Sequence, residues 1–285
     1  MAKNNEGPVT LFYDLESSPL KTWFWQPGQQ YVGHKNLIHG FDMWKIISIQ
    51  YAFDDEPVKV LRYDKDGGTK GMIEKFDKIA ERADIIIGKN NNRFDDKMIT
   101  TLRMFHGLKG RPQWTQCSDD LEKHMRKHFR LPSQSLDYIS RKLGVGGKIS
   151  MEMSDWIAIS NYREAVHLEL TPKQAKKMYG MSLAEVKKVG KSALEKMCTY
   201  GAKDTDDTRK IWNYLVEHFE PKFNMSTYNQ NGLSCKRCGS SELSKTGPRP
   251  SVSATTRVQQ WHCKTCSRYA GKATILANGS YGKMR

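Results

Sequence analysis

Acidic side chains fall at three widely separated places in this chain, each beside an expected strand or helix. Asp14 and Glu16 close an apolar run, Leu-Phe-Tyr-Asp-Leu-Glu, and alternate residues of a strand point to the same face. Both carboxylates can therefore reach one metal-binding locus just beyond the hydrophobic core. Asp95 lies at the entrance to an expected helix. Asp204 lies on the last long helix of the body, with Tyr200 one turn earlier on the same face.

Four carboxylates from three elements could hold two Mg²⁺ or Mn²⁺ ions about 4 Å apart. Such a pair activates a water molecule and stabilises the leaving oxygen in phosphodiester cleavage. Taken singly, each acid has a structural alternative: Asp14 as a strand-end cap, Asp95 as a helix cap, and Asp204 as one of several solvated acids. It is the combination of the acids that favours a metal site.

The cysteines contain a second pattern with metal chemistry. Cys235, Cys238, Cys263 and Cys266 form two C-x-x-C pairs separated by 24 residues, and the other two of the six cysteines are isolated. Each C-x-x-C supplies two thiolates from one tight turn, and four thiolates complete the shell of a tetrahedral Zn²⁺ ion. A pair of disulfides is the weaker alternative, because the first residues lack the apolar segment of a secretory signal and a reducing cytosol is expected. We therefore expect a zinc ribbon with one structural Zn²⁺ ion and no open position for catalysis.

The chain is basic, and its charge is unevenly placed. Its 46 Lys and Arg against 31 Asp and Glu give a net charge of +15. Residues 221–285 hold eleven Lys and Arg and a single acid, so this segment alone carries +10. A concentrated basic segment favours nucleic acid as a partner, with an acidic membrane second and a merely soluble basic surface as the remaining alternative.

Cations and aromatic side chains alternate in the same segment. Arg249, Arg257, Arg268 and Trp261 are expected to contact nucleic acid, because such a composition suits phosphates and stacked bases. For Trp261 an equal alternative is that it covers the zinc site of a small ribbon. A second group of aromatic residues follows the first acids, and we expect at least one member to contact substrate: Trp23, Phe24, Trp25, Tyr31, His34, Phe41 and Trp44.

Length and composition limit the function classes. With 285 residues, 38% of them hydrophobic, the chain can bury a core and is not compositionally disordered. No apolar stretch approaches the ~20 residues that span a bilayer, and the first residues lack the apolar segment of a secretory signal. These features predict a soluble protein of the cytoplasm.

Apolar runs and turn residues predict an α/β fold with a mixed sheet flanked by helices. The first three expected strands form a β-meander, and the chain from residue 116 onward is expected to be mainly helical. The expected strands are residues 9–13, 46–53, 58–63 and 83–88, and the expected helices include 70–82, 94–106, 136–143 and 202–219.

A polar, turn-rich stretch divides the chain into two expected domains. The body covers residues 1–222, a linker covers 223–231, and the zinc ribbon covers 232–285. Within the ribbon, residues 245–256 contain glycine and prolines and are expected to form a loop between two hairpins.

The three acidic segments resemble the motifs of the DEDD 3′–5′ exonucleases, the DnaQ-like family with a ribonuclease H-like fold. Asp14-Leu-Glu16 resembles the first motif, D-x-E after a strand. The segment Gly-Lys-Asn-Asn-Asn-Arg-Phe-Asp, which ends at Asp95, resembles the second motif. The run from Tyr200 to Asp204 resembles the third motif, Y-x-x-x-D. The third motif belongs to the tyrosine-bearing branch, which includes the proofreading domains of B-family DNA polymerases.

The resemblance covers about residues 9–218 and has two departures. Lys89 stands where the second motif usually has His, a position that is not normally a metal ligand, and its neighbour Asn90 is expected to contact nucleic acid. Residues 150–197 match nothing in the family and carry Lys-rich helical segments. No polymerase domain is present, and small stand-alone proteins of this kind with a zinc ribbon look most like phage-encoded nucleases, which would act in the host cytoplasm.

The resemblance implies a metal-dependent 3′–5′ exonuclease with two Mg²⁺ or Mn²⁺ ions. Asp14, Glu16 and Asp204 would bind the ion that generates hydroxide, with Asp14 bridging to a second ion near the leaving 3′ oxygen. Asp95 would hold this second ion directly or through water, and Tyr200 would orient the attacking water.

Two other functions are compatible with these residues. The same acids could serve a structure-selective endonuclease of the same fold. A non-catalytic nucleic-acid-binding adaptor is the alternative from another class, although every metal-binding acid and Tyr200 are present. Single-stranded DNA is favoured over RNA as substrate, and the ribbon could bind either the substrate or a replication or repair protein.

Overall fold

The computed structural model describes residues 8–22, 29, 31–38, 45–147, 149–219, 222–227, 232–252 and 257–282, with the backbone alone for residues 34 and 247–252. Among the aromatic residues expected to contact substrate, Tyr31 is 94% exposed. Five others lie outside the described residues: Trp23, Phe24, Trp25, Phe41 and Trp44.

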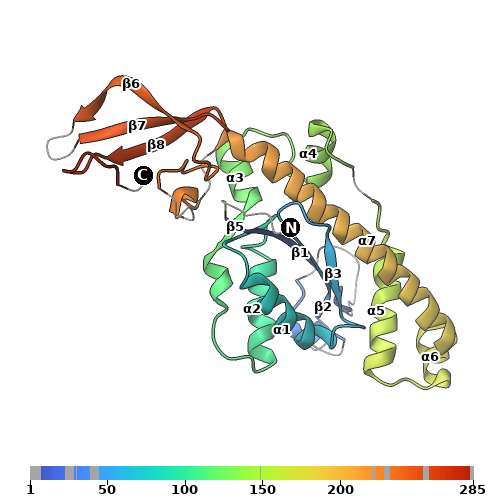
Figure 1. The fold of residues 1–285 in the computed structure, drawn as a ribbon. Coiled ribbons are helices and arrows are strands. Elements are labelled where there is room, and N and C mark those ends of the chain that lie inside the picture. Colours follow the sequence, from blue (N-terminus) through green and yellow to red (C-terminus); the bar gives the residue numbers. More distant parts are fainter. Residues whose placement is uncertain are drawn as a thin grey trace.

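A five-stranded mixed sheet forms the centre of the body (Figure 1). Its strands are β1 (Thr10–Ser17), β2 (Ile46–Phe53), β3 (Lys59–Arg62), β4 (Ile85–Gly88) and β5 (Ser118–Asp120). They lie in the order β3-β2-β1-β4-β5; β1, β2 and β3 pair antiparallel, and β4 and β5 run parallel to β1. The predicted meander and the fourth strand are confirmed. Strand β1 extends beyond its expected end and includes Asp14 and Glu16.

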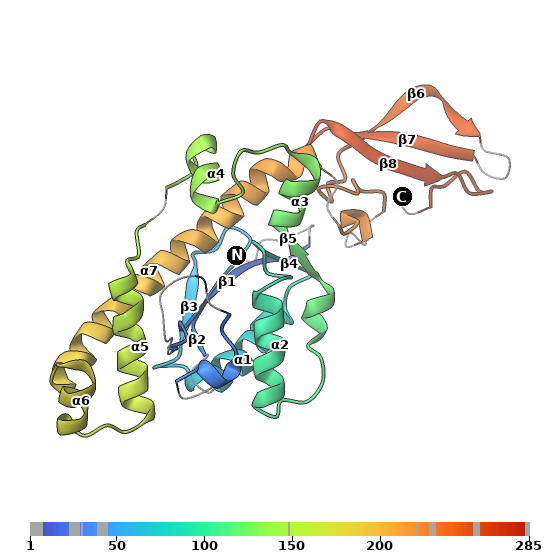
Figure 2. The same ribbon diagram turned by 180° about the vertical axis from the view of Figure 1, so that it is seen from behind.

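Helices cover both faces of the sheet (Figures 1 and 2). They are α1 (Gly68–Ala80), α2 (Asp95–Phe105), α3 (Leu121–His128), α4 (Leu136–Leu143), α5 (Met153–His167), α6 (Pro172–Tyr179) and α7 (Leu183–Leu215). The apolar residues of α1 and α2 share one core with Leu11 and Leu15 of β1. Those of α3, α4 and α7 share another core with Phe12. Because strand residues alternate between faces, Asp14 and Glu16 lie on the same face as Phe12, the one that α7 covers.

Helix α7 is 33 residues long and starts well before the helix expected from residue 202. Its N-terminus has a capping box, in which the Glu185 N–H donates to Ser182 Oγ at 3.2 Å and the Ser182 N–H donates to Glu185 Oε2 at 2.8 Å. Helix α5 packs beside α7, and both contribute to a third core with Ile47 of β2. Neither α7 nor any other helix within the described ranges is long and apolar enough to cross a membrane.

A second sheet follows the body, antiparallel and in the order β6-β7-β8 (Figure 1). Its strands are β6 (Leu243–Val252), β7 (Arg257–Cys263) and β8 (Arg268–Thr274). The expected loop over residues 245–256 is wrong for its described part, because β6 continues through Pro248 and Pro250. Prolines are tolerated here since β6 is an edge strand, and its register with β7 shifts between Thr246 and Ser251.

The segment that joins the two sheets packs against the body. Met225 is buried and joins the core beneath α7, and its N–H donates to the carbonyl of Lys236 at 2.9 Å. Arg237 Nη1 donates to the carbonyl of Glu217 at 3.0 Å. The described part of the expected linker, residues 223–227, therefore belongs to the contact between body and ribbon.

Candidate metal centres

Strand β1 places two carboxylates on the face covered by α7. Asp14 pairs in register with Gln50 of β2, and Glu16 pairs with Ser48. Gln50 Nε2 donates to Ser48 Oγ at 2.7 Å, and both of these side chains are fully buried. The two acids therefore stand beside a buried polar pair whose own hydrogen bond fixes it in place.

Helix α2 brings Asp95 to the same part of β1. Asp95 is the first residue of the helix, where the helix dipole favours a carboxylate, and it is buried. The Leu15 N–H donates to Asp95 Oδ1 at 3.3 Å, between the two acids of the strand. The neighbouring Asp96 accepts hydrogen bonds from the Tyr13 hydroxyl and from Ser118 Oγ, the latter at 2.9 Å. These contacts fix the start of α2 relative to β1.

Helix α7 places Tyr200 and Asp204 opposite the same strand. Gly201 permits the close approach, because a Cβ atom at this position would lie 2.5 Å from the side chain of Gln50. The Tyr200 hydroxyl donates a hydrogen bond to the Asp204 carboxylate, one turn away on the same helix face. Asp204 in turn lies close enough to Asp14 for the two charges to interact.

The structure thus brings the five predicted residues into one electrostatic cluster. Burial and the Asp204 charge raise the pKa of Asp14 to about 7. Burial and the Asp14 charge raise the pKa of Asp95 well above its ordinary value. Burial and Asp204, with smaller contributions from Glu16 and Asp14, raise the pKa of Tyr200. The shared cause is an excess of negative charge where little water is present, which is the environment that a cation would relieve.

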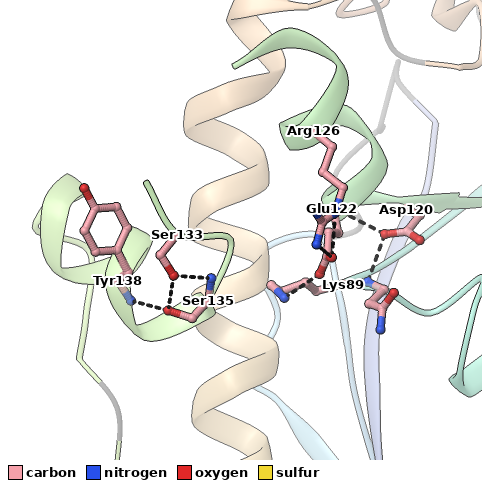
Figure 3. Close-up of polar contacts among 8 residues, drawn as sticks. Lys89, Asp120, Glu122, Arg126, Ser133, Ser135 and Tyr138 are labelled. Atoms are coloured by element: carbon pink, nitrogen blue, oxygen red, sulfur yellow. Dashed lines mark hydrogen bonds and ion pairs between the residues drawn. The ribbon is translucent and has the colours of Figure 1, made fainter. Parts of the chain in front are cut away.

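Lys89 lies beside Glu122 of α3, and both side chains are drawn in Figure 3. Lys89 Nζ pairs with Glu122 Oε2 at 2.9 Å, and Glu122 also pairs with Arg126 at 2.6 Å. The Lys89 charge lowers the pKa of Asp14, against the effect of burial. Sequence motifs mark Lys89 only as a departure from the family pattern, and nothing in the sequence singles out Glu122. The structure shows that both belong to the surroundings of the acids.

Asn90 turns the chain between β4 and α2. Its φ of 62° lies in the left-handed region, which asparagine tolerates better than most residues. Its backbone N–H donates to Asp120 Oδ1 at 2.9 Å, a bond drawn in Figure 3. This geometry explains asparagine at the turn, and the contact of Asn90 with nucleic acid stays a prediction.

The carboxylate cluster has the donor chemistry of a Mg²⁺ or Mn²⁺ site. Both ions prefer oxygen ligands, and the pKa values of Asp14 and Asp95 are raised first by burial and then by neighbouring carboxylates, both of which a bound cation would offset. The oxygens are less convergent than the thiols below: among the described residues, only the cysteines bring three or more ligand atoms within 4.8 Å of one another.

Four cysteines converge at the base of the second sheet. All four Sγ atoms lie within 4.8 Å of one another, with 3.8 Å from Cys235 to Cys266 and 3.6 Å from Cys238 to Cys263. These distances exclude disulfides, whose sulfurs are about 2.05 Å apart. Thiolates 2.3 Å from a central zinc form a tetrahedron with edges of about 3.8 Å. The cluster could therefore hold one structural zinc ion, as the sequence predicts for a zinc ribbon.

Trp261 covers this cluster. It is 9% exposed, packs in one core with Cys235 and Cys263, and meets the ring of Tyr281 edge-on at 5.2 Å. Of the two roles expected for Trp261, the structure supports the covering role, because a buried indole has no open face on which a base could stack.

The basic residues of the ribbon are spread along its strands. Arg257 is exposed at the start of β7, whereas Arg268 is half-buried at the start of β8, beside Cys263. The two therefore lie toward opposite ends of the antiparallel pair. The side chain of Arg249 lies outside the described residues. Contacts of these arginines with nucleic acid stay predictions.

Comparisons with known proteins identify the fold of the body. No protein-family model matches the chain, and no curated protein matches it in sequence. Among solved structures, the chain is similar to the family B DNA polymerase from the hyperthermophilic archaeon Pyrobaculum calidifontis, with a TM-score of 0.50 and 12% sequence identity. The likeness covers 74% of this chain and 25% of the polymerase chain, so it spans a quarter of that protein. The body has a ribonuclease H-like fold. At this identity the likeness concerns the fold alone.

Proposed function

We propose that this chain is a metal-dependent 3′–5′ exonuclease that hydrolyses phosphodiester bonds at the 3′ end of nucleic acid, with single-stranded DNA as the favoured substrate. The main support is the cluster of Asp14, Glu16, Asp95, Tyr200 and Asp204, which come from three segments far apart in sequence and lie around the second half of β1. The fold is similar to that of a DNA polymerase, and the three motifs resemble those of the DEDD family.

The residues have separable roles in this proposal. The four carboxylates would hold two divalent metal ions, which when bound lower the pKa of water and stabilise the leaving oxygen. Tyr200 donates to Asp204 and would orient the attacking water from the same helix face. The hydrogen bond from the Leu15 N–H to Asp95 and the interaction of Asp95 with Asp14 support including that carboxylate in the proposed site.

The zinc ribbon would help to bind the substrate. Its segment carries +10 of the net charge of +15, and neutralising phosphates by Lys and Arg is the main source of sequence-independent affinity for nucleic acid. Four thiolates leave no open position on zinc, so this metal would have a structural role only.

A cleavage time course on 5′-labelled single-stranded DNA and RNA tests the proposal. Wild type is compared with Asp14→Ala and with Asp55→Ala, a control that removes an exposed acid at the turn after β2. Each is assayed with Mg²⁺, with Mn²⁺ and with EDTA. We expect a ladder that shortens one nucleotide at a time, lost with EDTA and with Asp14→Ala but kept in Asp55→Ala.

Two other outcomes would overturn the exonuclease proposal. Discrete internal cuts that depend on Asp14 would identify an endonuclease with the same acids. Binding of the oligonucleotide without any cleavage, equal in wild type and Asp14→Ala, would identify a non-catalytic binding protein.

A further inference from the structure

A pocket of about 230 Å³ lies between helix α5, the start of α1, the end of α2 and the start of β2. Its lining residues lie in α5, at the start of α1, just before β2, just after β3 and just after α2, and none of those described is a carboxylate. The volume has room for several water-sized groups. The pocket is separate from the acids of the carboxylate cluster, none of which lines it.

Arg163 of α5 is the most unusual residue of this pocket. It is 8% exposed, its guanidinium lies over the ring of Tyr63 at 5.0 Å, and its Nη1 has no hydrogen-bond partner among the described residues. The next residue, Glu164, is paired with Lys21 and accepts from Tyr179 at 2.9 Å, so it does not compensate the arginine. Burial lowers the pKa of Arg163 to about 10, which still leaves it charged at neutral pH. A buried charge without a counter-ion is costly, and an anion in the pocket would remove that cost.

The N-terminus of α1 opens on the same pocket. Gly68 and Thr69, its first residues, line the pocket. The N-cap residue, Gly67, provides no side-chain hydrogen bond, and the first turn has no acid. An α-helix of 13 residues presents N–H groups and partial positive charge at this end, which makes it a suitable partner for an anion.

Other basic groups complete the surroundings. Lys45 precedes β2 and lines the pocket together with His106 and His167. His106 Nε2 is buried without a hydrogen-bond partner among the described residues. Burial and the charges of Lys45 and Lys70 lower the pKa of His106, and Glu74 acts in the opposite direction with a smaller effect. The local potential is therefore positive.

We propose that this pocket binds a phosphate group, held by Arg163, Lys45 and the first turn of α1. The Gly68 N–H already donates to the carbonyl of Tyr63 at 3.0 Å, so the N–H groups offered to the anion are those of Thr69 and Lys70. A tetrahedral oxyanion can accept hydrogen bonds from an arginine fork, an ammonium group and a helix N-terminus at once, whereas a planar carboxylate offers only two oxygens.

The position of the pocket relates it to the carboxylate cluster. The Ser18 N–H donates to the carbonyl of Lys45 at 2.9 Å, so Lys45 lies next to the chain that leaves β1. It is three residues from Ser48, the residue paired with Glu16, which corresponds to about 10 Å along a strand. If the proposed nuclease function holds, this phosphate belongs to the bound nucleic acid or to the released mononucleotide.

Binding of phosphate itself can be measured without any cleavage. Full-length wild type, Arg163→Met and Lys45→Met are compared with Lys78→Met, a control that removes an exposed lysine from the last turn of α1. Melting temperatures are recorded in sodium phosphate, in deoxyadenosine monophosphate and in sodium chloride at equal ionic strength, all without added divalent metal. We expect phosphate to stabilise wild type and Lys78→Met, and to stabilise the two pocket variants little or not at all.

The source of the phosphate is distinguished by oligonucleotide binding, measured without added divalent metal by fluorescence anisotropy over a range of salt. If the site holds the nucleic acid backbone, both pocket variants bind a single-stranded oligonucleotide about ten-fold more weakly, with a salt slope smaller by about one. If it holds a mononucleotide, oligonucleotide binding is unchanged, but stabilisation by the monophosphate is lost. Equal responses of wild type and both pocket variants to all three ligands would overturn the proposal. Lys45→Met carries the test should Arg163→Met fail to fold, and neither readout depends on nuclease activity.

Discussion

The pKa of Asp14 is set by opposing effects of its surroundings. Burial and the charge of Asp204 favour the protonated form of Asp14. The Leu15 N–H and the charge of Lys89 favour its ionised form. The balance leaves its pKa at about 7, so this one carboxylate links metal binding, pH and stability.

The first prediction concerns the stability of the metal-free protein. Because folded Asp14 holds its proton more tightly than the unfolded chain does, the free energy of unfolding falls as pH rises from about 4 to about 7. Asp14→Asn should show a flatter dependence over this range, though not a flat one, because the pKa of Asp95 is also raised. Urea denaturation in EDTA at a series of pH values measures this, with Asp55→Asn as the exposed control.

Divalent metal should reverse the trend at neutral pH. Mg²⁺ or Mn²⁺ favours ionised carboxylates, so it should raise the unfolding free energy of wild type more than that of Asp14→Asn. Parallel pH curves for wild type and Asp14→Asn would show that Asp14 does not titrate in the folded protein near pH 7.

The second prediction concerns Lys89. Replacing it with Met removes a positive charge that lowers the pKa of Asp14, and should therefore shift the acid limb of the pH–activity profile to higher pH. The conservative Lys89→Arg should keep the wild-type profile, as should Lys127→Met, which removes an exposed lysine from α3. A Lys89→Met profile that differs only in height would mean that the lysine acts on affinity and not on the titration of the acids.

At the scale of elements, the carboxylate cluster depends on how closely α7 lies on the sheet. Gly201 lies against Gln50, the residue paired with Asp14, and Gln50 cannot move without losing its bond to Ser48. One glycine in the third motif therefore sets the distance between the acid of the helix and the acids of the strand.

The third prediction follows from this contact. Gly201→Val should force α7 away from β2, because even a Cβ atom would lie 2.5 Å from the Gln50 side chain. We expect a loss of about 1–3 kcal/mol in unfolding free energy and a larger loss of metal-dependent activity, since Asp204 moves with the helix. The matched control is Ala184→Val, which adds the same side chain at an exposed site of α7. Gly180 is not a suitable control position, because the backbone φ of Gly180 is positive. Equal activity in the two variants would show that this approach is not required.

The elements predicted from sequence are those whose apolar residues repeat. β2 and β4 are runs of buried isoleucine and other apolar residues, and α1 shows helical spacing of Met72, Ile73 and Phe76. Strand β5 escapes prediction because its three residues are polar. They can be buried because other elements supply their partners: Asp119 meets His124 at 2.9 Å, and Asp120 accepts from the N–H groups of Asn90 and Glu122.

The candidate site divides in the same way. Its acids could be found because motifs of fixed spacing contain them, and the cysteines because C-x-x-C pairs are rare and chemically specific. Glu122, Gln50 and Arg163 could not be found, because each matters through a contact with a residue distant in sequence. The prolines of β6 misled for a related reason: whether a strand lies at an edge is a property of the sheet, not of the segment.

At the scale of the whole molecule, the ribbon is held by its cysteines on one side and by the body on the other. Its core is small and includes two of the four cysteines, Cys235 and Cys263, together with Trp261. Small domains of this size usually need a metal or disulfides for stability.

The fourth prediction is that the ribbon depends on zinc whereas the body does not. Cys263→Ser, or a zinc chelator, should increase amide hydrogen exchange across β6, β7 and β8 and leave β1, β2 and α1 protected. Oligonucleotide binding, measured without added Mg²⁺ or Mn²⁺ and without chelator for the wild type, should become weaker, because the segment with +10 charge loses its ordered surface. The control is Cys117→Ser, a cysteine outside the cluster. Unchanged exchange in the chelated ribbon would show that no metal supports its fold.

Helix α7 has a mechanical consequence, because one continuous helix carries Asp204 in its second half and ends at Leu215, before the segment that joins the body to the ribbon (Figures 1 and 2). Asp204 and Leu215, the last residue of the helix, are about 16 Å apart along its axis, at a rise of 1.5 Å per residue. The helix thus fixes both a distance and a direction, since each added residue also rotates the far end by about 100° about the helix axis. A single residue inserted between these positions would rotate the ribbon to another side of the molecule. Seven inserted residues make nearly two full turns, so they would lengthen the helix and leave the ribbon facing nearly the same direction.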